Sequence, residues 1–154
     1  GSIEHAQLVR HADLARFARL GITASVQPEH AIDDRDLAER LWATQDSLGY
    51  PLASLFAAGA DVRFGSDAPV AALDPWQAMA AAVTRTENAR DAWHPEEAVT
   101  FDQALQASIR STSVPGAPAD LALCAADPRR ATGTHLRDMP VVATLLAGRV
   151  THRA

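Results

Sequence analysis

Lysine is absent from this sequence, because all 14 basic residues among its 154 are arginine. Chemistry that needs a lysine amine, such as a Schiff base, is therefore excluded. The single cysteine, Cys124, excludes an internal disulfide framework and a cysteine-built zinc site, and its apolar surroundings predict a buried structural thiol. Long apolar runs and a secretory signal are also missing, so we expect a cytoplasmic protein with no membrane partner.

Basic residues are also outnumbered by acidic ones, 14 to 19. The net charge is −5 and the isoelectric point is about 5.6, which argues against nucleic acid or an anionic membrane as a partner because both need a basic face. The hydrophobic content of 47% is enough for a real core, and the length fits one ordinary domain. Gly1-Ser2 resembles the scar of a cleaved tag, and a strand pattern follows at once. We therefore expect the chain to be a piece of a longer protein.

Three short predicted strands each deliver a polar residue near their carboxyl ends. The strand that ends at Phe64 is followed by Gly65-Ser66-Asp67. A carboxylate in such a place is costly unless a metal, a cation or hydrogen bonds offset its charge. His5 stands beside a short apolar start, and His30 lies just past the strand that ends at Val26. Polar groups delivered in this way assemble the active sites of βα-repeat barrels.

Helix and strand patterns alternate along the first 110 residues, and further strand patterns follow after residue 119. They predict helices at 11–20, 34–48, 52–58, 75–86 and 101–109, and strands at 22–26, 60–64, 120–125, 140–146 and 149–152. In the second helix, Leu37, Leu41 and Leu48 are predicted to point inward. Strands separated by helices pair in parallel through right-handed crossovers, and three parallel strands make a poor sheet alone because both faces need cover. The missing neighbours must come from another segment or another chain.

The character of the sequence changes after residue 110. Residues 111–119 are rich in serine, threonine, proline and glycine and predict a linker. The strands predicted after it form a small all-β tail, in which Ala147-Gly148 makes a tight turn. The predicted fold class is therefore α/β, with one part over residues 1–112 and a tail over residues 113–154.

Seven motifs follow one another along nearly the whole chain. They are Ile3-Glu-His-Ala-Gln7, Ser25-Val-Gln-Pro-Glu-His30, Phe64-Gly-Ser-Asp-Ala-Pro-Val70, Ala82-Val-Thr-Arg85, Trp93-His-Pro-Glu-Glu97, Ala119-Asp-Leu-Ala-Leu123 and Leu146-Ala-Gly-Arg-Val150. In this order they resemble the carboxyl-terminal third of the amidohydrolase superfamily, and more narrowly the branch of N-substituted formamide deformylase-like hydrolases. The resemblance implies a TIM-type (β/α)8 barrel, of which this chain holds the last three βα units, followed by a small β-sandwich segment.

The resemblance also implies roles for two residues. His5 matches the metal-binding histidine of strand six, and Asp67 matches the strand-eight aspartate that binds metal and shuttles the proton of the attacking water. The implied cofactor is a divalent metal, and zinc is the expected ion given nitrogen and oxygen ligands. Such an ion lowers the pKa of a bound water and polarises the scissile carbonyl. The implied reaction is hydrolysis of a C–N bond in a small-molecule amide or formamide.

Other parts of the metal site that the resemblance implies have no match. The His-x-His pair of strand one, the bridging residue of strand four and the histidine of strand five are absent. With two matched ligands, we expect weak or no metal binding and no activity by the chain alone. Two alternatives stay open. The chain is either a non-catalytic module that self-associates through exposed strand edges, or one half of a split hydrolase whose amino-terminal barrel portion is a separate polypeptide.

Two further residues are candidates for substrate binding. His30 follows Pro28 on a predicted loop that faces the barrel mouth, where substrate contact or support of the site competes with ordinary loop polarity. Arg85 pairs either with a substrate carboxylate or with a helix carboxyl terminus, and the sequence favours the second alternative. A serine hydrolase is excluded because Ser66 lacks the Gly-x-Ser-x-Gly elbow.

Overall fold

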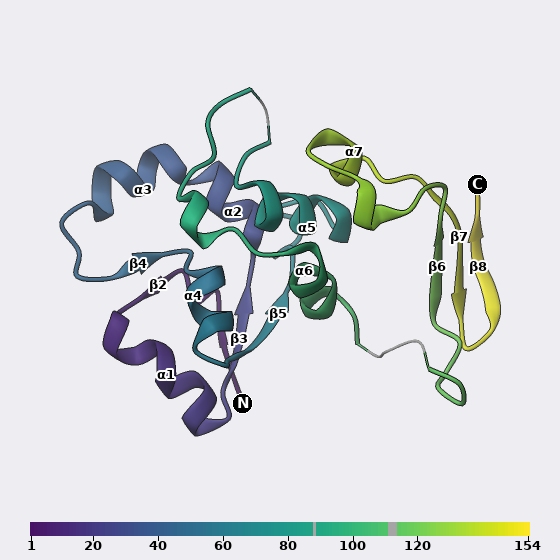
Figure 1. The fold of residues 1–154 in the computed structure, drawn as a ribbon, viewed down its shortest axis with the longest axis horizontal. Helices are drawn as coiled ribbons and strands as arrows, with labels where there is room; N and C mark the ends of the chain where they lie inside the picture. Colours follow the sequence, from purple (N-terminus) through teal and green to yellow (C-terminus); the bar gives the residue numbers. More distant parts are fainter. Residues whose placement is uncertain (88, 111–113) are drawn as a thin grey trace.

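A parallel three-stranded sheet forms the centre of the first part of the chain. The computed structural model describes residues 1–87, 89–110 and 114–154. The sheet has the order β1 (Ser2–Glu4), β3 (Thr23–Val26) and β5 (Asp61–Phe64), and both neighbouring pairs are parallel. The predicted parallel pairing is therefore confirmed, and the carboxyl ends of the three strands share one edge of the sheet (Figure 1).

Helices connect and cover these strands. They are α1 (His11–Leu20), α2 (Pro28–Asp33), α3 (Arg35–Trp42), α4 (Leu52–Ala57), α5 (Pro75–Thr84), the 3-10 turn η1 (Pro95–Glu97) and α6 (Phe101–Ser108). Helix α1 ends at Gly21, whose φ of 61° is a left-handed conformation that glycine adopts without strain. Helix α6 begins at a capping box, in which Thr100 and Gln103 each accept a hydrogen bond from the other's backbone N–H.

The segment between β3 and α4 differs from the prediction. Pro28 stands in the first turn of α2 instead of leading into a loop, because proline has the backbone angle of a helix start and no N–H to satisfy there. Helix α3 ends at Trp42, six residues before the predicted end. Leu48 instead pairs with Val9 in the antiparallel ladder of β2 (Leu8–Val9) and β4 (Leu48–Gly49).

One face of α3 is apolar and uncovered. Leu37 and Leu41 are 45% and 55% exposed, so the prediction that they point inward was wrong. Ala38 and the partly buried Trp42 are the residues of α3 that pack against the core, and Leu37 and Leu41 lie on a more exposed face. In the part of the chain that the structure describes, nothing buries these two leucines.

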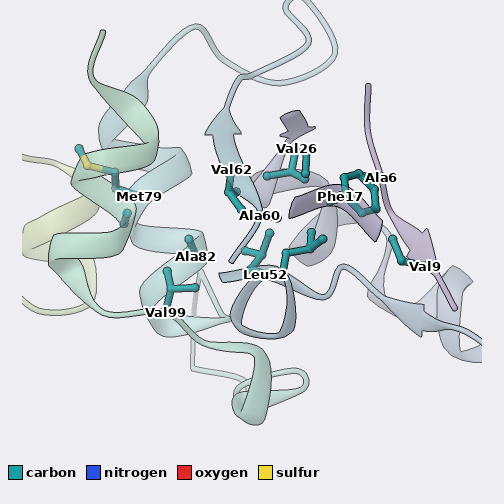
Figure 2. Packing of buried hydrophobic residues seen from close by; sticks show 13 residues of the cluster. Ala6, Val9, Phe17, Val26, Leu52, Ala60, Val62, Met79, Ala82 and Val99 are labelled. Carbon is teal, nitrogen blue, oxygen red and sulfur yellow. The ribbon is translucent and has the colours of Figure 1, made fainter. Parts of the chain in front are cut away.

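The core lies where the sheet meets the helices. Figure 2 shows Val26 and Val62 from neighbouring strands beside Leu52 from α4, with Val99 nearby. Leu55 is fully buried in the same cluster. Helix α5 contributes mostly alanines, whose small size allows it to approach its neighbours closely. This core fixes β3 and β5 and therefore the positions at which they end.

Strand β1 is the exception to this cover. All three of its residues are exposed, whereas Ala24 in the adjacent strand β3 is fully buried. Parallel strands are normally covered on both faces. Within the described ranges, β1 has no strand neighbour on its other side. The first strand therefore lacks the surroundings that its geometry requires.

The tail forms a second sheet with a helix inserted between its strands. Strands β6 (Leu121–Cys124), β7 (Val141–Leu146) and β8 (Arg149–Arg153) pair antiparallel, and the turn at 147–148 is confirmed. The expectation of an all-β tail was wrong, because η2 (Pro128–Arg130) and α7 (Thr134–Arg137) lie between β6 and β7. Cys124 is partly buried, and this burial raises the pKa of its thiol. The predicted linker at 111–119 and boundary at 112 fall partly on 111–113, outside the described residues.

Helix α7 connects this tail to the first part of the chain. It packs against α5, at a distance from the tail sheet in Figure 1. Leu136 is only 1% exposed there. Nη1 of Arg137 donates to Oε1 of Glu29 in α2 at 2.7 Å, in an ion pair whose side chains are 15% and 10% exposed. An exposed second pair joins Arg129 of the tail to Asp102 of α6.

The buried Glu29 carboxyl predicts a specific pH dependence. Burial raises its pKa from the ordinary 4.5 more than Arg137 lowers it. The folded chain then binds a proton more tightly than the unfolded chain, so the free energy of unfolding should fall as the pH rises above 4.5 and level off above the raised pKa. Urea unfolding of wild type and Glu29→Gln, from pH 4 to 8 with chelator present, measures this. The wild type should show the extra slope, and equal slopes would contradict it.

None of the helices in the described ranges combines the length and the apolar character needed to cross a bilayer.

Candidate metal centre

Three side chains converge at the carboxyl edge of the parallel sheet. His5 directly follows β1, Asp67 lies three residues after β5, and His30 is in the first turns of α2 after β3. Each offers one ligand atom, and these atoms all lie within 4.8 Å of one another. The sheet order places β3 between β1 and β5, so each strand contributes one member of the group.

The geometry of the group is set by two pairwise contacts. Nε2 of His5 is 3.9 Å from Oδ2 of Asp67, and both side chains are a little over 40% exposed. The rings of His5 and His30 are stacked, with centroids 5.8 Å apart and planes inclined by 21°. His5 therefore lies between a carboxylate and a second imidazole, with its ring open to solvent.

The backbone around the group is unusual. His5 has a φ of 67°, Ala6 has a φ of 40° and Asp67 has a φ of 55°. Residues other than glycine seldom adopt this left-handed region, and each instance costs on the order of 1–3 kcal/mol. Such conformations gather at functional sites, where the surrounding structure holds them in place. Two of the three converging side chains come from such positions.

His30 occupies a different place from the one predicted. It is in helix α2, not on a loop, and is 7% exposed. Its Nε2 is buried and has no hydrogen-bond partner among the residues that the structure describes. A buried polar atom without a partner is costly, so this nitrogen is suited to bind a metal ion. The sequence did not predict this role for His30. The available sequence clue was position, since His30 follows the end of a strand as His5 and Asp67 do.

Comparison with other proteins identifies the family of this chain. Residues 1–152 match the amidohydrolase family over almost the entire chain. The chain belongs to the amidohydrolase family. The broader part of the predicted resemblance is therefore confirmed, and the narrower branch stays a prediction.

Relatives of known structure support the same family. The crystal structures of two uncharacterized metal-dependent hydrolases are similar to the structure of this chain. The one from Pyrococcus horikoshii OT3 has a TM-score of 0.57 and 28% identity, and covers 70% of this chain and 22% of its own. The one from Pyrococcus furiosus has a TM-score of 0.53 and 29% identity, and the match covers 68% of this chain and 21% of the Pyrococcus furiosus chain.

A plant protein is similar in sequence. Protein LONG AFTER FAR-RED 3 of Arabidopsis thaliana is 37% identical over 114 residues, which are 72% of this chain and 20% of the plant protein. The amidohydrolase chain described here thus spans about a fifth of the length of the relatives that it matches.

The three side chains suit a divalent transition metal. Two imidazoles and one carboxylate are the donor set of many catalytic zinc sites. Tetrahedral zinc with bonds of 2.0–2.2 Å brings ligand atoms to about 3.4 Å from one another. The His5–Asp67 pair at 3.9 Å is close to this spacing, and its exposed side chains are free to close further around an ion. His30 is the fixed member, because it is buried in a helix.

Arg85 lies apart from this group. It ends helix α5 with a φ of 55° and is fully buried. Its Nε donates to the backbone carbonyl of Trp93 at 3.0 Å. Its guanidinium carbon is 5.5 Å from the centre of the Trp93 indole ring. Among the described residues, no hydrogen bond or ion pair joins Arg85 to His5, His30 or Asp67. These contacts favour the structural alternative for Arg85, and its predicted contact with substrate stays a prediction.

Proposed function

We propose that this chain is the carboxyl-terminal part of a metal-dependent amidohydrolase of the N-substituted formamide deformylase-like branch. The group of His5, His30 and Asp67 at the carboxyl edge of a parallel sheet carries the proposal. This edge holds the active site in (β/α)8 barrels. The parallel sheet and its helices then supply the last three βα units of the barrel, and the tail sheet supplies part of a β-sandwich.

The proposed reaction is hydrolysis of a C–N bond in a small-molecule amide or formamide. A divalent metal, with zinc as the proposed ion, supplies Lewis acidity that lowers the pKa of water and polarises the carbonyl. Asp67 takes the proton from the attacking water and passes it to the leaving nitrogen, which yields a carboxylic acid and an amine. His5 and His30 hold the ion through neutral imidazole nitrogens.

The chain is proposed to be inactive by itself. Every residue of strand β1 is exposed although its pairing is parallel, and the relatives are about five times as long. Both observations support an amino-terminal barrel portion that pairs with β1, on the same polypeptide or on a separate one. Further metal ligands and most of the surface that grips the substrate belong to that portion.

Self-association is a second candidate function. The uncovered leucines of α3 and the exposed strand β1 are surfaces that another copy of this chain can bury. A non-catalytic assembly module would use them in this way. Size-exclusion chromatography with light scattering separates the two candidates, since a monomer that unfolds cooperatively would contradict the assembly module.

Co²⁺ titration tests the proposed function directly. Weak or no binding was expected from two ligands, and His30 adds a third. Co²⁺ occupies zinc sites and absorbs visible light, so the metal-free chain should develop bands that saturate and that disappear with chelator. The same chain should show no hydrolysis of N-substituted formamides. Absence of Co²⁺ uptake would contradict the metal centre. Hydrolysis by the purified chain that a chelator blocks would show that no further barrel portion is needed.

A further inference from the structure

The pair of Glu29 and Arg137 is the most deeply buried ion pair in the part of the chain that the structure describes. It joins residues 108 positions apart, with Nη1 of Arg137 at 2.7 Å from Oε1 of Glu29. Every other ion pair described there has at least one side chain exposed by more than 40%. Leu136 beside it is fixed in the core. The tail therefore contacts α2 at one charged and rigid point.

Each of the two buried charges is compensated mainly by the other across this contact. Within the described parts of the chain, Oε2 of Glu29 and Nη2 of Arg137 are buried without hydrogen-bond partners. Neither side chain can turn away without leaving an uncompensated charge in an apolar environment, which is the costly state for a buried pair. In some proteins a buried pair contributes to orientation more than to stability. Here it acts together with the packing of α2, of which residues 28–32 are buried.

His30 directly follows Glu29 in the same turn of α2. This helix has only six residues, and few bonds of its own resist a rotation. A rotation that moves Glu29 away from Arg137 also moves the adjacent His30, whose ring is stacked on that of His5. The pair and the candidate ligand are thus coupled through two consecutive residues of α2.

We propose that Arg137 is a positioning residue for the metal centre, because it holds Glu29 and thereby fixes the direction of the His30 imidazole toward His5 and Asp67. The inference rests on the proposed function, since it concerns a metal bound by these side chains. Residues that orient a metal ligand from outside the coordination shell typically change metal affinity by about 10–100-fold.

A thermodynamic cycle with Co²⁺ as the probe tests the proposal. Arg137→Ala should weaken Co²⁺ binding by about 10-fold or more. In a His30→Ala background the same change should have almost no further effect, because the ligand that Arg137 orients is already gone. Arg137→Lys keeps the charge and should recover part of the affinity. A residue that only stabilises the fold would lower the affinity equally in both backgrounds or leave it unchanged.

The chain offers a matched control. Arg129→Ala removes the other ion pair that joins the tail to the first part of the chain, but Arg129 contacts Asp102 of α6 at an exposed position far from α2 in sequence. Its Co²⁺ affinity should equal that of wild type. A loss as large as that of Arg137→Ala would assign the effect to tail docking in general and overturn the proposal.

Hydrogen exchange of the metal-free protein separates failure of this inference from failure of the proposed function. Arg137→Ala should speed exchange at the amides of α2 and leave those of α1 at the wild-type rate. If wild type takes up no Co²⁺, the proposed function fails, and the positioning of a metal ligand fails with it. If wild type binds Co²⁺ but Arg137→Ala changes neither the affinity nor the exchange of α2, this inference alone fails.

Discussion

Replacing Asp67 with asparagine should lower the affinity of the chain for Co²⁺ or Zn²⁺ by more than about 100-fold, beyond the range usual for residues outside the coordination shell. Asparagine has nearly the same shape but no charge, so the variant keeps its volume and loses the one anionic ligand of the group. The two histidines remain, and two neutral ligands bind a divalent ion weakly. Isothermal titration of metal-free wild type and variant measures the difference.

Thermal unfolding gives an independent measure of the same effect. An ion at 100 times its dissociation constant stabilises the folded state by about 2.7 kcal/mol when it does not bind the unfolded chain. Wild type should therefore melt at a higher temperature with metal, and Asp67→Asn should show almost no shift. Asp61→Asn is the control, because Asp61 begins the same strand β5 that Asp67 follows, at the opposite edge of the sheet. Equal shifts in wild type and Asp67→Asn would remove Asp67 from the ligand set.

The second large effect is expected at Arg85. Its replacement by alanine should lower the free energy of unfolding by about 2–5 kcal/mol, because a fully buried large side chain leaves a cavity. Replacement by methionine should change it by less than about 1.5 kcal/mol, since methionine fills similar space. The guanidinium remains charged at neutral pH although burial lowers its pKa to about 10, and two of its nitrogens have no hydrogen-bond partner in the described ranges. Removing that buried charge offsets the lost hydrogen bond to Trp93.

Urea unfolding followed by circular dichroism compares these variants. Arg16→Ala is the control for loss of an arginine, because Arg16 is exposed and pairs with Asp13 on the surface of α1. Exposed pairs contribute up to about 1 kcal/mol. Should methionine prove as damaging as alanine, the charge of Arg85 itself would be required. That outcome would assign the stabilisation to the contacts of the guanidinium with Trp93 and to the nearby charge of Glu97.

Local patterns in the sequence were enough for much of the first part of the chain. Helix α1, strand β5 and helix α6 lie close to where their sequence patterns predicted them. The positions of His5 and Asp67 after two strands followed from the same patterns. Parallel strands place such residues at one edge, so their convergence could be expected from topology alone.

Contacts between distant segments account for what the sequence did not predict. Leu37 and Leu41 have the spacing of an inward helix face, but that face has no cover among the described residues, so periodicity gave the wrong orientation. Helix α7 has four residues, too few for a periodic pattern. The contact between Glu29 and Arg137 spans most of the chain, and neither residue carries a local mark of its partner.

The separation of Glu29 and Arg137 has a consequence for biosynthesis. A ribosome makes His5, His30 and Asp67 long before it reaches Arg137, so a nascent chain has these three candidate ligands before it has the group that orients His30. Metal bound at that stage would be held more weakly and would exchange faster. A premature stop codon just before Arg137 would therefore remove the proposed orientation of His30 while sparing the three side chains themselves.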